Sequence, residues 1–147
     1  MDLQKFAVKF FATDPSAVKI DTFIPVFHRW IQTDAAAGMA LDVADYGHLP
    51  QGPGVVLIGY EADHYLDSME GPLGLLYSRK QPQPGPLADR ILASFKAALA
   101  ACARLEQEPE LAGKLSFRRG EALFIANDRL LAPNTEESFR ALRADLE

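Results

Sequence analysis

The residues of this sequence that are best suited to chemistry are acids and histidines gathered in its middle. Between Arg29 and Arg79 the chain has seven acidic residues and two of its three histidines, but neither lysine nor arginine. The whole chain has a net charge of −5 at pH 7, of which this segment contributes −7 and the remainder +2. Carboxylates that have no cations near them in the sequence must be solvated, paired with distant basic residues, or bound to a cation. The acidic segment is therefore the first place to look for a site.

Four residues of the acidic segment predict a metal site. Asp45 and Glu61 end two expected strands, and His48 and His64 follow them closely. Carboxylate and imidazole together suit Mn, Fe or Zn, and they could also serve as acid and base in a metal-dependent hydrolysis or isomerisation. The sequence has no HExxH, paired CxxC or calcium-loop motif. A solvated edge and an acidic docking face for a basic partner protein remain alternatives.

A structural interpretation of the same acids makes its own prediction. The C-terminal half supplies Arg118, Arg119 and Arg129 on or beside an expected hairpin. If that hairpin adjoins the acidic strands, the carboxylates of Asp45 or Glu61 should pair with one of these arginines. Such pairs would explain the acidic segment without any ligand.

A second candidate site combines residues suited to a flat anionic ligand. His28 could ligate a metal, Arg29 could hold a carboxylate, and Trp30 could stack on an aromatic plane. Consecutive helical residues point in different directions, so the alternative is a boundary histidine beside a core tryptophan. Asn127 and Arg129 follow an expected strand, at a common place for binding groups. An Asx turn beside an unengaged arginine is the alternative there.

The periodicity of apolar residues predicts the elements that must position these groups. Alternation and turn residues predict strands, and apolar residues at helical spacing predict helices. The expected strands are 4–11, 41–46, 55–61, 73–80, 115–119 and 121–126, and the expected helices begin after Asp21 or Thr22, at Leu87 and at Asn134. The order β-α-β-β-β-α-β-β-α predicts one α+β domain over residues 1–147, with a mainly antiparallel sheet and helices packed on one face. A ferredoxin-like sandwich with extra strands fits this order best.

Two expected helices carry specific predictions. The last helix should open with a capping box formed by Asn134 and Glu137, and it should bury Phe139, Leu142 and Leu146. The helix beginning at Leu87 should run to about Glu108, with Cys102 on its apolar stripe as inert packing.

Composition limits the class of protein. With 147 residues, 48% of them hydrophobic, the chain can form a core without disulfides. Its single cysteine suits a reducing compartment, and it shows neither a secretory signal nor an apolar run long enough for a membrane span. A pI near 5.2 argues against nucleic-acid binding. We expect a cytoplasmic protein that does not bind membranes, and a homodimer remains open.

The stretches FIPVFHRWIQ, LDVADYGHLPQGPGVVLIGYEADHY, GLLYSRK and NDRLLAPNT resemble a family of small uncharacterised bacterial proteins, over most of the chain. Some relatives in that family are labelled haem-binding from remote similarity, and no catalytic residue can be carried over. The resemblance implies haem as a first ligand to test, although CxxCH is absent. The leading hypothesis is a ligand-binding protein for haem or another planar anion, with His28 as axial ligand and Arg29 or Arg129 holding the carboxylates. A metal-dependent enzyme and an interaction module are the alternatives.

Overall fold

Six strands and three α-helices make up the described part of the chain. The structure is a computed structural model that describes residues 2–33, 40–47, 52, 54–69 and 71–147. The strands are β1 (Phe6–Phe11), β2 (Ala40–Tyr46), β3 (Gly54–Gly59), β4 (Ala62–Asp67), β5 (Gly74–Arg79) and β6 (Leu123–Ala126). The helices are α1 (Phe23–Thr33), α2 (Leu87–Gln107) and α3 (Glu136–Leu146), and the short 3-10 turns η1 (Pro15–Ala17) and η2 (Ile20–Thr22) precede α1.

The strands form one sheet in the order β2-β3-β4-β5-β1-β6, in which every neighbouring pair is antiparallel. β1-α1-β4 and β5-α2-β6 are split β-α-β units, because one strand lies between the two strands of each unit. This is the ferredoxin-like arrangement. The β2–β3 hairpin, inserted after α1, lengthens the sheet beyond β4. The predicted α+β class with an antiparallel sheet is confirmed.

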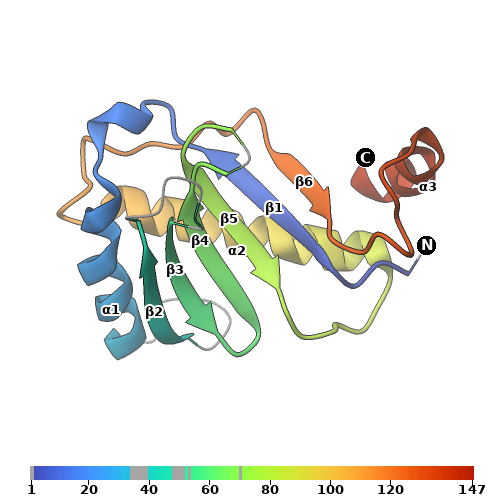
Figure 1. Cartoon of the computed structure of the whole chain (residues 1–147), viewed down its shortest axis with the longest axis horizontal. Coiled ribbons are helices and arrows are strands. Elements are labelled where there is room, and N and C mark those ends of the chain that lie inside the picture. Colours follow the sequence, from blue (N-terminus) through green and yellow to red (C-terminus); the bar gives the residue numbers. More distant parts are fainter. Residues whose placement is uncertain (1, 34–39, 48–51, 53, 70) are drawn as a thin grey trace.

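One face of the sheet packs on α1 and α2, and no helix among the described residues covers the other, which we call the open face. The register places Val8, Tyr77, His64, Leu57 and Val43 in a row across five strands. This row lies on the helix side, because the two-residue period sends alternate side chains to opposite faces and the core contains its apolar members. α2 lies behind β5 and β1, and α1 packs against β2 (Figure 1). The open face is therefore lined by the intervening residues.

α2 follows the prediction closely. It begins at Leu87 and ends at Gln107, and its buried residues include Ile91, Cys102 and Leu105. Burial raises the pKa of the Cys102 thiol to about 12, so the thiol stays protonated and serves as core packing. No helix among the described residues is long and apolar enough to cross a membrane.

α3 belongs to a second, smaller core at one end of the molecule. Leu142 is its buried residue, and it joins Leu3, Phe6, Leu87, Ile91 and Ala132 in a cluster separate from the main one. The prediction that this helix also buries Phe139 and Leu146 is wrong, since they are 55% and 36% exposed. The cap is also one residue later than predicted. The Thr135 hydroxyl oxygen accepts the Ser138 N–H at 3.2 Å.

Two strand predictions are also wrong. β4 is a separate strand that the sequence pattern missed, because Asp63, Tyr65 and Asp67 occupy its open-face positions and disguise it as a polar loop. The predicted hairpin within residues 115–126 does not form. Phe117 makes a bridge to Ala12, and residues 123–126 pair with β1 instead.

Candidate functional site

The predicted metal ligands do not gather in one place. Asp45 and Glu61 lie at opposite ends of the β2–β3 hairpin, because Asp45 pairs with Val55 at the start of β3 whereas Glu61 follows the end of β3. Asp45 is exposed and accepts the Gly47 N–H at 2.9 Å. Among the described residues, no three His, Cys, Asp or Glu side chains are placed to hold a metal ion.

His64 lies in the core on the helix side of β4. It is 1% exposed, its ring meets Tyr77 edge to face with 5.1 Å between centroids, and its Nε2 has no hydrogen-bond partner. Burial lowers the pKa of His64 to about 4, against the opposing effect of the Asp63 charge. It is therefore a neutral core residue at pH 7. The fourth predicted ligand, His48, lies outside the described residues.

His28, Arg29 and Trp30 point in three directions, as consecutive helical residues must. His28 is exposed, whereas Trp30 is buried and donates its Nε1–H to Glu108 Oε1 at 2.8 Å. Arg29 pairs with Glu108 and with Glu110. These two carboxylates raise the pKa of Arg29. The pKa of Glu108 is lowered by the hydrogen bonds from Trp30 and Arg29, which outweigh the effect of burial. Arg29 and Trp30 thus anchor α1 to the segment just after α2.

Three cations from outside the acidic segment pair with three of its acids. The ion pairs are Lys9 with Asp67 at 2.7 Å, Lys80 with Asp63 at 3.0 Å, and Arg79 with Glu61 at 3.7 Å. The predicted arginine partners are wrong: Arg118 and Arg119 pair with Glu121 and Glu106 instead. The reason is topological, because β6 adjoins β1 rather than the acidic strands β2, β3 and β4.

The Lys9–Asp67 pair is buried although it lies on the open face of the sheet. Lys9 is 0% and Asp67 5% exposed, and Lys9 Nζ also donates to the Asp67 main-chain carbonyl at 3.2 Å. Gly74 lies between them in the register, opposite Phe11 and Asp67. A Cβ at Gly74 would lie 2.9 Å from Lys9 Cε and 2.4 Å from the Phe10 carbonyl oxygen. The missing side chain thus lets the lysine cross β5 to reach its partner.

A cavity of about 290 Å³ lies on the open face beside this pair. Its apolar wall is supplied by Ala7, Met69, Leu76 and Ile125, and its polar groups come from Tyr65, Asp67, Ser78 and Asn127. Burial, together with the nearby Asp63, raises the pKa of Tyr65, so the phenol stays protonated and can donate. The volume is at the lower end of the range of about 300–1,000 Å³ for small-molecule pockets. This cavity is the candidate ligand site.

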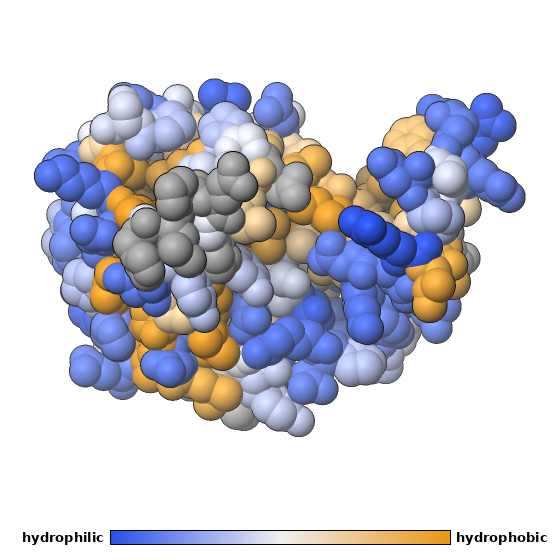
Figure 2. Space-filling view, viewed as in Figure 1, coloured by the Kyte–Doolittle hydropathy of each residue, from blue (hydrophilic) through white to orange (hydrophobic). Residues whose placement is uncertain are grey.

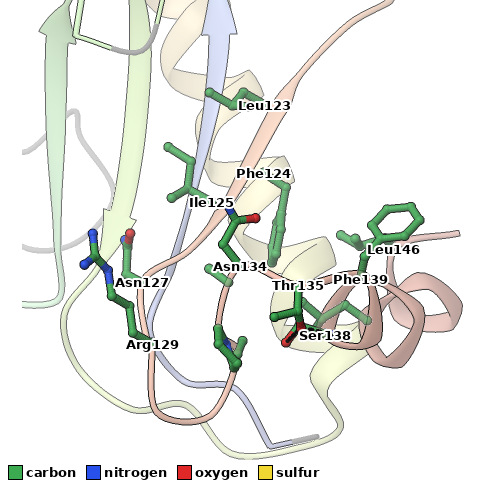
Figure 3. A pocket seen from close by; sticks show the side chains of 14 residues that line it. Leu123, Phe124, Ile125, Asn127, Arg129, Asn134, Thr135, Ser138, Phe139 and Leu146 are labelled. Carbon is green, nitrogen blue, oxygen red and sulfur yellow. Dashed lines mark hydrogen bonds between the residues drawn. The ribbon is translucent and has the colours of Figure 1, made fainter.

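A larger groove of about 1060 Å³ runs between β6 and α3. The predicted residues Asn127 and Arg129 both line it, and their side chains lie next to each other just after β6 (Figure 3). Asn127 and Ile125 line the open-face cavity as well, so the two hollows meet at this end of β6. The predicted Asx turn is present too, because the Asp128 side chain accepts the Leu130 and Leu131 N–H groups. The Asx turn is therefore confirmed, whereas a binding role for Asn127 and Arg129 stays a prediction.

Sequence reasoning missed three groups of the open-face cavity or its floor: Lys9, Tyr65 and Ser78. A two-residue period places Lys9 on the face opposite the core, which normally means a solvated lysine. Its burial depends on Gly74 and Asp67, which are more than 50 residues away in the chain. No local signal marks any of the three as part of a site.

The described histidines do not fit the haem expectation. His28 lines neither hollow, and His64 faces the core on the opposite side of the sheet. An axial imidazole at either hollow would have to come from these residues or from His48, which lies outside the described residues. The groups that line the open-face cavity suit a smaller ligand than a porphyrin.

Comparisons with family models, with curated proteins and with solved structures find no match for this chain.

Proposed function

We propose that this protein binds a small ligand in the open-face cavity, and that the ligand carries a carboxylate or carbonyl group on an apolar, planar body. The observation that supports this most directly is the lining of the cavity. Tyr65, Ser78 and Asn127 bring hydroxyl and amide hydrogen-bond donors to walls that are otherwise apolar.

The charges around the cavity favour an anion over a cation. Lys9 neutralises Asp67, which is the carboxylate of the lining. Tyr65 stays a neutral donor because its pKa is raised. Arg129 lies beside Asn127 at the edge of the cavity and has no ion-pair partner among the described residues. An oxygen-bearing ligand would therefore meet donors and a positive charge, with no unpaired acid of the described lining to repel it.

The other interpretations have less support. The described members of the predicted metal set are dispersed, which weakens the enzyme hypothesis. Asp63 and Asp67 are engaged in internal pairs, so an acidic docking face would rest mainly on the exposed Asp42 and Asp45 of β2. A cytoplasmic location remains our proposal, supported by the single buried cysteine.

The test is a binding titration with 2-naphthoate and its neutral relative 2-naphthylmethanol, followed by calorimetry. We expect naphthoate to bind more tightly, and Tyr65→Phe and Ser78→Ala each to weaken it about 3–10-fold, the worth of one hydrogen bond. Tyr60→Phe is the matched control, because Tyr60 is 55% exposed and does not line the cavity. If neither compound binds, or if all three variants behave alike, the proposal fails.

Hemin tests the haem expectation separately. Because His28 lies on the exposed surface of α1, we expect the Soret band of added hemin to respond equally to wild-type protein and to His28→Ala. A band that shifts with wild-type protein and is lost in His28→Ala would show that the imidazole ligates iron after all.

A further inference from the structure

The outer edge of β6 offers unpaired main-chain groups. Asn127 N–H donates to the Lys5 carbonyl at 2.8 Å, and Ile125 pairs with Ala7 in the same ladder. In an antiparallel ladder, alternate residues direct both their N–H and C=O groups to the same neighbour. Phe124 and Ala126 therefore direct these groups away from β1, towards the free edge.

The two edges of the sheet differ in how they are protected. β2, at the far edge, carries the exposed acids Asp42 and Asp45, and its pairing shifts register between Ala40 and Asp42. Charges and irregular register are the usual devices that keep an edge strand from pairing further. β6 reads Leu-Phe-Ile-Ala and has no charge, proline or bulge within it. Of the two edges of the described sheet, β6 is therefore the one suited to another strand.

α3 lies alongside the place that a neighbouring strand would take. Figure 1 shows the helix beyond the free edge of β6, joined to it by the loop 127–135, and Figure 2 shows a hollow between this helix and the rest of the molecule. Phe139 and Leu146 line this groove and are exposed, although their helical spacing is that of a buried stripe. Paired strands lie about 4.8 Å apart, and a strand added to β6 would enter the groove that β6 and α3 line.

The positive charge at one end of the groove indicates which side chains the bound segment should carry. Arg129 lines the groove, and it has no ion-pair partner among the described residues. Asn127 lies beside Arg129 and adds an amide there, and Asn134 adds a second amide elsewhere in the lining (Figure 3). A carboxylate on the incoming chain would meet these donors, whereas a basic residue would be repelled.

We propose that the β6–α3 groove binds an extended segment of a partner polypeptide, which adds to β6 as a seventh strand. The segment has apolar side chains at alternate positions, directed towards Phe124 and Phe139, and an acidic side chain next to Arg129. Main-chain hydrogen bonds to Phe124 and Ala126 hold the strand, and the apolar wall and the arginine select its sequence. This interaction goes beyond the small-ligand site and does not depend on it.

Selection from a random nine-residue peptide library displayed on phage tests the proposal, with the Kd of the selected peptides measured by fluorescence anisotropy. We expect Ala126→Pro to weaken binding at least tenfold, because proline removes an edge donor that the β1 ladder does not use. Ala126→Val keeps that donor and should bind like wild type. Arg129→Met should weaken peptides that carry an acidic residue, and Tyr65→Phe should have no effect.

A second variant guards against misfolding of Ala126→Pro. Phe139→Asp places a charge in the wall of the groove at an exposed position, so the fold is retained while apolar peptides are rejected. The amide protons of Phe124 and Ala126 should also exchange more slowly when peptide is bound. The proposal is overturned if no peptide is enriched, or if the selected peptides bind Ala126→Pro and Phe139→Asp as tightly as wild type. A dimer in sedimentation that Ala126→Pro dissociates would overturn it as well, by assigning the edge to a second copy.

Discussion

Lys9 shows how strongly a single residue can depend on distant ones. Its ammonium group is fully buried, bonded to Asp67 and 5.6 Å from the centre of the Phe11 ring. A buried ion pair adds little net stability relative to an apolar pair. Removing one partner, however, leaves the other charge buried without compensation. The energetic consequence of this pair therefore appears when one partner is removed.

We predict that Lys9→Met lowers the free energy of unfolding by about 3–5 kcal/mol, because it leaves the Asp67 carboxylate buried without a cation. The double variant Lys9→Met/Asp67→Leu should recover most of that loss. Lys5→Met, at an exposed position of the same chain segment, is the control and should change stability by less than about 0.5 kcal/mol. Urea unfolding measures all three. Equal small losses for Lys9→Met and Lys5→Met would show that the pair is solvated.

His64 predicts how stability depends on pH. Its pKa is about 4 in the folded protein, below the ordinary value of 6.5. Between these values the unfolded chain binds a proton that the folded chain does not, so stability is complete above about pH 6.5 and falls as the pH drops towards 4. The loss should be about 3 kcal/mol at most. His64→Leu should flatten the dependence in that range and His28→Ala should not, as measured by urea unfolding at several pH values. A wild-type profile that is flat from pH 6.5 to 4 would contradict a buried neutral histidine.

At the scale of elements, Glu108 fastens α1 to the end of α2. Its carboxylate accepts from the buried Trp30 indole and from Arg29, while Glu110 contacts Arg29 alone and is partly exposed. A buried donor without a partner costs more than an exposed ion pair is worth.

We predict that Glu108→Ala destabilises the protein by about 1–3 kcal/mol, because the Trp30 N–H loses its acceptor. Glu110→Ala should cost less than about 1 kcal/mol. Thermal unfolding of the two variants provides the comparison, and Trp30 fluorescence reports locally on the same contact. If the two losses are equal, the indole has found another acceptor and the anchor is not specific to Glu108.

At the scale of the whole molecule, the separation into two cores predicts uneven stability. The main core joins α1 and α2 to the sheet, whereas α3 is held mainly by Leu142 in the smaller cluster. Elements with few buried contacts open at a lower free energy than the rest of a protein. α3 should therefore open independently of the sheet.

We predict that Leu142→Ala speeds amide hydrogen exchange throughout α3 while β1, β4 and β5 keep their protection. Exchange measured by mass spectrometry distinguishes this from global destabilisation. Leu105→Ala, in the main core, is the contrasting variant and should lower protection in the sheet as well. Uniform loss of protection in Leu142→Ala would mean that the two clusters unfold as one.

The sequence by itself determined the elements that rest on local periodicity. The apolar stripes of α1 and α2 and the alternation in β1 and β3 specify a helix or a strand without reference to the rest of the chain. The runs of consecutive strands in the predicted order were enough to predict the mainly antiparallel α+β class. β4 was not predicted, because its open-face residues are Asp63, Tyr65 and Asp67. A short segment with so many polar residues resembles a loop in the sequence.

Tertiary structure alone decided which side chains meet. Periodicity says that Asp45 and Glu61 end their strands, but only hairpin pairing places them at opposite ends. Strand order set β6 next to β1, which gave the acids Lys9, Arg79 and Lys80 as partners instead of the predicted arginines. Pairing across long sequence separations has no local signature, because it depends on the strand order of the whole sheet. The open-face cavity and the free edge of β6 both result from that strand order.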